Sequence, residues 1–161
     1  AECGMSNDMM VMKTIEYIEQ NPDVEYVVAQ FIVPRRIMYY KNGWKNITPW
    51  TKTTEARVFY KYLDSQESRM INLWKNVYIL DQYLSDIPHY FFRASEASEK
   101  TVSDDCIFKK LVPWSDMVTL HDLIGTPETH PKHYVTGHPN KQGHYLISQH
   151  LQGVVPNSLY H

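Results

Sequence analysis

A histidine in a tight turn near the end of the chain is the residue best placed to do chemistry. His138 follows Gly137 and precedes Pro139 and Asn140, and apolar residues recur at helical spacing from Lys141 onward. Glycine and proline restrict the turn, and acid–base residues concentrate on loops that a rigid scaffold positions. His138 is therefore predicted to act as a general base. The alternative is a surface or capping residue in front of a helix.

The residues around this histidine resemble the last conserved block of the SGNH (GDSL-type) hydrolases. That block has an Asp two or three residues before a His, followed by Pro, Asn and, three residues on, Gly. Here the run Gly-His-Pro-Asn at 137–140 is followed by Gly143. The resemblance implies that His138 takes the proton from a nucleophilic serine. Thr136 and Val135 stand where the family has the Asp that orients the histidine. Either a Ser–His pair acts without that Asp, or an Asp from elsewhere in the chain takes its place.

A second site residue precedes the first predicted helix. Ser6, Asn7 and Asp8 lead into an apolar stripe, which predicts a helix from Asp8 to Gln20 and suits these residues to capping rather than catalysis. With the strand that follows, this helix makes half of a β-α-β unit whose other strand would end just before Gly4. In the SGNH family a glycine at that point lends its backbone N–H to the oxyanion hole, so the resemblance implies this role for Gly4. A plain turn is the alternative.

The rest of the chain alternates strand and helix patterns. Residues 24–33 are β-branched and aromatic, which predicts a buried parallel strand covered on both faces. Residues 37–54 have no period and are predicted to form an insertion loop, whose aromatic rings either pack the loop down or line a sugar or acyl pocket. The remaining periodicity predicts helices over 54–63, over 67–84 and from Lys141, and a short aromatic strand over 89–92.

One further family feature is missing. In SGNH hydrolases the strand corresponding to 24–33 is followed by a Gly-x-Asn-Asp loop whose Asn is another oxyanion donor. The stretch Gln30–Arg36 has no Asn. Gln30, Arg35 or Arg36 could donate instead, since arginines at the carboxyl end of a strand can hold a carboxylate or phosphate; ordinary surface charge is the alternative.

Length and composition limit the class of protein. With 161 residues, 43% of them hydrophobic, the chain is predicted to be one domain, 1–161. The net charge of −2 is spread along the chain, which disfavours a nucleic-acid or membrane partner. No apolar run approaches the roughly 20 residues of a membrane span. Only Cys3 and Cys106 occur, which favours a soluble cytoplasmic protein, although two thiols could pair.

Five histidines between His130 and His150 invite a metal site, but their spacing suits no ligand set, so neither metal nor cofactor is predicted. The expected fold is α/β, with a small, mostly parallel sheet flanked by helices. The resemblance implies the flavodoxin-like sheet of the SGNH hydrolases, in a variant associated with phage and marine-bacterial proteins, and an activity on esters such as acetylated carbohydrates.

The family's Gly-Asp-Ser block, which carries the nucleophile, does not occur in the 161 residues. The resemblance therefore implies a shortened domain that lacks its first strand and is inactive as it stands. An open sheet edge would follow, and such edges recruit partners, so a homo-oligomer is expected. The alternative is a non-catalytic structural or glycan-binding module on the same scaffold.

Overall fold

The computed structural model describes residues 5–32, 35–94, 102–135 and 138–155, and these form a mixed α/β fold. The elements in chain order are α1 (Asn7–Gln20), β1 (Val27–Phe31), β2 (Ile37–Tyr40), β3 (Trp44–Ile47), α2 (Thr54–Val58), the π-helical turn η1 (Phe59–Leu63), α3 (Gln66–Tyr83), β4 (His89–Arg93), α4 (Ile107–Leu111), η3 (Trp114–Asp116), α5 (Leu120–Ile124), η4 (Pro131–His133), β5 (Tyr134–Val135), β6 (His138–Pro139) and α6 (Lys141–Val154). The helices predicted from apolar periodicity are confirmed, and each predicted first or last residue lies within one or two residues of the observed one.

One pair of strands is parallel. β1 pairs with β4 in a register that runs from Val27 opposite His89 to Phe31 opposite Arg93. Parallel strands need a long crossover, which α2 and α3 provide here. Among the described residues the other two strand pairs, β2–β3 and β5–β6, are antiparallel. The predicted parallel pairing is thus confirmed for β1 and β4, which form one of three separate two-stranded sheets among these residues.

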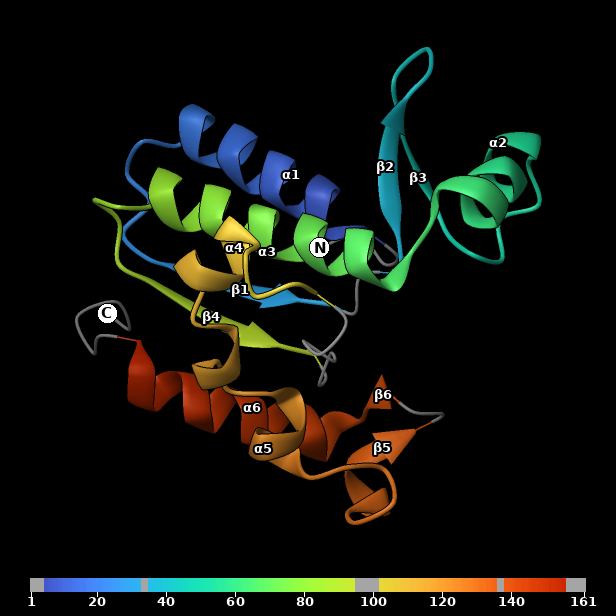
Figure 1. Ribbon diagram of the computed structural model, residues 1–161. Coiled ribbons are helices and arrows are strands. Elements are labelled where there is room, and N and C mark those ends of the chain that lie inside the picture. Colours follow the sequence, from blue (N-terminus) through green and yellow to red (C-terminus); the bar gives the residue numbers. More distant parts are fainter. Residues whose placement is uncertain (1–4, 33–34, 95–101, 136–137, 156–161) are drawn as a thin grey trace.

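Helices lie on both faces of the parallel pair (Figure 1). Alternate β1 residues Val27, Ala29 and Phe31 point into the main core, together with the buried face of α3. On the other face, Phe92 of β4 packs with Leu120 and other residues of α5 and α6. The result is a three-layer arrangement in which α1 and α3 form one outer layer and α5 and α6 the other (Figure 1).

The prediction that β1 is covered on both faces is wrong. Val28 is 40% exposed and Gln30 is also exposed, so burial alternates along the strand. The reason is that α6 lies against β4, where the Tyr90 hydroxyl is 2.9 Å from His150 Nε2. β1 keeps one face partly open, at Val28 and Gln30.

The stretch predicted to be an insertion loop contains a hairpin. β2 and β3 are joined by a turn in which Asn42 has φ 52° and Gly43 has φ 110°. Asn-Gly suits a tight hairpin turn because both residues tolerate positive φ. The hairpin projects beside the N-terminal end of α1 (Figure 1), where the Ser6 hydroxyl donates to Asn46 Oδ1 at 2.7 Å.

Three aromatic rings of this stretch are exposed to solvent. The exposed fractions are 68% for Tyr40, 50% for Trp44 and 63% for Trp50, so packing as the reason for these three rings is wrong. Ile47, which is 4% exposed, anchors the hairpin instead.

Candidate functional site

The carboxyl ends of β1 and β4 meet the N-terminal ends of α1, α3 and α6 at one end of the molecule (Figure 1). We call this end the carboxyl-end face. Backbone N–H groups at helix N-termini favour negative charge, and open α/β sheets bind ligands outside the carboxyl ends of their strands. The face therefore has the general properties of a binding site for an anionic or polarised group.

His138 lies at this face. It occupies β6, where it pairs with Val135 of β5, and its side chain is exposed to solvent. Asn140, two residues later, begins α6. Gly4 and Gly137 lie outside the described residues, as does Thr136, so the predicted approach of Gly4 to His138 stays a prediction.

Asn140 fixes the backbone that carries His138. Its Oδ1 accepts hydrogen bonds from the backbone N–H groups of Gln142 at 2.9 Å and Gly143 at 3.1 Å. Its Nδ2 donates to the carbonyl of Lys132 at 2.7 Å. One side chain thus caps α6 and ties it to η4, which is why an asparagine follows the His-Pro pair.

Gly143 lets α6 approach η4 closely. A Cβ at this position would lie 2.6 Å from the backbone oxygen of His133 and 3.1 Å from Cβ of Pro139. Only glycine fits so near another backbone. Asn140 and Gly143, two residues of the run that carries the family resemblance, therefore each have a structural reason to be present.

Two other histidines, His130 and His133, pack against each other. His133 is 6% exposed, and its Nδ1 lies 2.6 Å from the carbonyl oxygen of Ile124, so Nδ1 carries the proton and donates. The ring of His130 stacks on that of His133, with centroids 5.2 Å apart. Within the described ranges, no group of three His, Cys, Asp or Glu side chains is arranged to hold a metal ion.

Asp122 is a nearby acid in sequence, but it is engaged elsewhere. Its Oδ2 accepts from the hydroxyl of Thr119 at 2.6 Å and from the backbone N–H of Thr119 at 2.7 Å. The hydroxyl bond is the largest cause of a pKa of Asp122 below its usual value. The carboxylate caps α5, so it is held in place for that role rather than for orienting His138.

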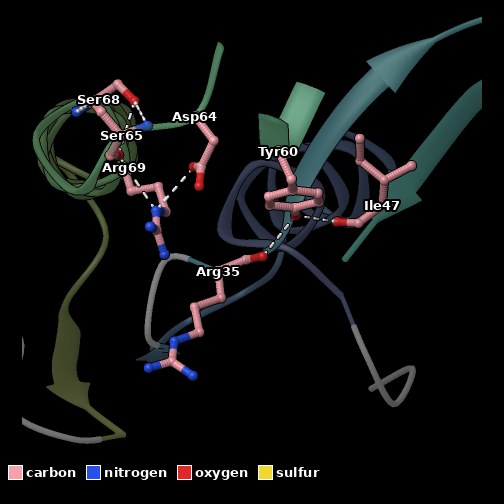
Figure 2. Close-up of polar contacts among 7 residues, drawn as sticks. All are labelled: Arg35, Ile47, Tyr60, Asp64, Ser65, Ser68 and Arg69. Atoms are coloured by element: carbon pink, nitrogen blue, oxygen red, sulfur yellow. Dashed lines mark hydrogen bonds and ion pairs between the residues drawn. The ribbon is translucent and has the colours of Figure 1, made fainter. Parts of the chain in front are cut away.

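A polar cluster that the sequence did not reveal supports the chain after β1 (Figure 2). The Tyr60 hydroxyl contacts two carbonyl oxygens, Arg35 O at 2.8 Å and Ile47 O at 3.1 Å. Burial raises the pKa of Tyr60 to about 12, and the charge of Asp64 adds to the effect. Tyr60 therefore stays a neutral donor at physiological pH and joins β3 to the segment at Arg35.

The same cluster is closed by an ion pair. Arg69, in the first turn of α3, places Nε 2.9 Å from Asp64 Oδ1 and 3.3 Å from the carbonyl oxygen of Ser65 (Figure 2). Ser65 and Ser68 form a reciprocal capping box at the start of α3. The π-helical turn that carries Tyr60 follows α2 without a break, and helical periodicity gives no signal that distinguishes it from α-helix.

Comparison of the chain with protein-family models, with curated proteins and with solved structures found no match. Among the described residues, no helix combines the length and the apolar character needed to cross a bilayer.

Proposed function

We propose that the chain is an SGNH-like acyl-ester hydrolase scaffold on which His138 is the general base. The observation that supports it is the place of His138, which immediately precedes the N-terminal end of α6 at the carboxyl-end face. Its exposed ring is accessible to a substrate there. The finer fold assignment, a flavodoxin-like SGNH sheet, is part of the same proposal.

The proposed chemistry is acyl transfer through a serine. A serine hydroxyl attacks the ester carbonyl carbon while His138 takes its proton, and the backbone N–H of Gly4 stabilises the oxyanion. His138 then returns the proton to the departing alcohol, and water hydrolyses the acyl-serine by the same steps. We assign the nucleophile to no serine of this chain, because none stands in a Gly-Asp-Ser run. The chain by itself is therefore expected to be inactive.

Turnover of p-nitrophenyl acetate tests the proposal, measured on this chain and on a longer form that adds any residues its gene encodes upstream. We expect activity in the longer form and a fall in kcat of about 100-fold on His138→Ala, the range of a lost general base. Because His138 is exposed, Tm should not change. His144→Ala is the matched control, because His144 is also an exposed histidine and lies close by in the sequence, on α6. Absence of turnover in both forms, or equal turnover with and without His138, would contradict the proposal.

A second candidate function is glycan binding without catalysis. Tyr40, Trp44 and Trp50 expose their rings around the β2–β3 hairpin, as given above. Tyr40 and Trp44 meet edge to face with centroids 5.3 Å apart, and the Arg36 guanidinium carbon lies 5.6 Å from the centroid of the Trp50 ring. Rigid rings with polar neighbours are suited to stacking on the apolar faces of sugars.

Replacing Trp44 with alanine should weaken such binding. We expect the wild-type chain to be retained by an insoluble glycan such as chitin, cellulose or acetylated xylan, and Trp44→Ala to lose at least about tenfold in affinity, since buried aromatic anchors dominate binding energies. Tyr17→Ala, which removes an exposed ring from α1, is the control and should bind normally. Equal retention of both variants would exclude the hairpin as a glycan site.

The homo-oligomer that was expected to cover an open sheet edge stays a prediction.

A further inference from the structure

One edge of β1 has no strand beside it among the described residues. The Val27 N–H donates to Pro88 O at 3.0 Å, and Phe31 O accepts from Ala94 N–H at 2.8 Å. In a parallel ladder alternate residues direct both backbone groups to the same neighbour. The backbone groups of Val28 and Gln30 therefore point away from β4, toward the free edge.

Asn7 shows where this edge ends. Its Oδ1 accepts from the backbone N–H of Ile32 at 3.0 Å, and its Nδ2 donates to the carbonyl of Ile32 at 3.0 Å. The side-chain amide makes the pair of bonds that a neighbouring strand would make. Ile32 is thus satisfied, and the groups that remain for a partner are those of Val28 and Gln30.

A groove of about 700 Å³ runs along the same edge. Met10, Thr14 and Tyr17 of α1 line one side of it, and Leu151 of α6 is part of its lining. Val28 and Phe92 also line the groove. The free edge is therefore recessed between helices, with apolar surface for side chains on both faces of an added strand.

We propose that this groove binds an extended peptide segment, which adds a strand to β1 and carries apolar side chains on both faces and an acidic residue near Arg36. Main-chain hydrogen bonds to an open sheet edge, with pockets for alternate side chains, are a known mode of peptide recognition. Among the described residues that line the groove, the charged ones are Arg36 and Lys13, both cationic, and Lys13 also pairs with Glu16 at 2.8 Å. Cationic lining calls for an acidic side chain in the partner.

The recess favours a single extended segment over the β1 edge of a second copy. Paired strands must come within about 4.8 Å of each other. In a second copy the same edge is set back between its own α1 and α6, so the helices of the two copies would meet first. Peptide binding in this groove does not depend on whether the chain hydrolyses esters.

Amide hydrogen exchange followed by NMR tests the inference. The probes are two acetylated and amidated hexapeptides, Val-Ile-Val-Leu-Gly-Asp and Asp-Gly-Leu-Val-Ile-Val, which place the acid beside Arg36 in a parallel and an antiparallel strand respectively. In the free protein, the amides of Val28 and Gln30 should exchange much faster than those of Ala29 and Phe31. One of the peptides should slow exchange at Val28 and Gln30 at least tenfold.

Two variants separate strand addition from loose adsorption. Val28→Pro removes an N–H from the free edge without touching the ladder to β4, so peptide affinity should fall at least tenfold while Ala29 and Phe31 stay protected. The Arg36→Glu protein should bind the better of the two peptides more weakly than the wild type does. It should bind the same peptide with Lys in place of Asp more tightly. If neither peptide protects Val28 and Gln30, the inference is overturned. The inference is also overturned if the amides of Val28 and Gln30 are protected without peptide and this protection grows with protein concentration, because a second copy of the chain would then occupy the edge.

Discussion

Replacement of Asn7 by alanine is expected to lower the free energy of unfolding by about 3 kcal/mol. Asn7 is 4% exposed, and its side chain makes two hydrogen bonds to the backbone of Ile32. Removing it leaves a donor and an acceptor of the chain without partners, and each such group costs about 1–3 kcal/mol when water cannot reach it. Water can reach these two groups from the groove and lowers their combined cost, so the expected loss of free energy lies toward the lower end of the summed range.

Urea unfolding followed by circular dichroism measures this effect. Asn21→Ala, at the other end of α1, is the matched control, because the Asn21 side chain donates to the Tyr17 carbonyl in an exposed position. Its loss should cost only about 0.5 kcal/mol, as exposed groups regain their bonds from water. Equal losses in the two variants would show that the Asn7–Ile32 pair contributes no more than an ordinary surface bond.

Gly143→Ala is expected to destabilise the protein by about 3 kcal/mol. The added methyl would lie 2.6 Å from the backbone oxygen of His133, and that oxygen also accepts a bond from the Asn140 N–H at 2.8 Å. Neither group can move without disturbing the start of α6. Overpacking of this kind costs about 1–3 kcal/mol and outweighs the better helix propensity of alanine.

The control for this substitution lies on the same helix. Gly153 is in the last turn of α6, and a Cβ there has no atom within 4 Å. Gly153→Ala should therefore stabilise the protein by about 0.5–1 kcal/mol through helix propensity alone. Thermal and urea unfolding of both variants should give changes of opposite sign. A stabilising Gly143→Ala would mean that α6 does not pack this closely on η4.

Local signals in the sequence predicted most of the helices. Apolar periodicity located α1, α3 and α6, and Ser6 was correctly assigned to capping, since it accepts from the Met9 N–H at 3.2 Å. The strand β4 was also predicted correctly from its aromatic residues. These features depend on residues a few positions apart, which is the range over which sequence patterns carry information.

The parts that were not predicted depend on contacts between distant residues. The partners of Asn7 and Tyr60 lie 25 positions away, at Ile32 and Arg35. No local pattern specifies such pairs. The β2–β3 hairpin is different, because Asn42-Gly43 is a recognised hairpin signal that should have outweighed the lack of strict alternation.

The position of His138 before a helix was predicted, whereas its catalytic role stays a prediction. The sequence located His138 directly before a helix, and the structure has it there, in a two-residue strand. Gly4 lies outside the described residues. The family resemblance rested above all on the run 137–140 with Gly143, and capping and close packing account for Asn140 and Gly143 in that run.

The long crossover between β1 and β4 has a consequence for biosynthesis. At about 5–20 residues per second, a ribosome takes several seconds to make the segment that separates the two strands. During that time β1 has no partner strand, and its apolar side chains Val27 and Phe31 lack α3 to cover them. The bonds from Asn7 to Ile32 join only residues already synthesised, so they can hold the nascent strand against α1 until β4 emerges.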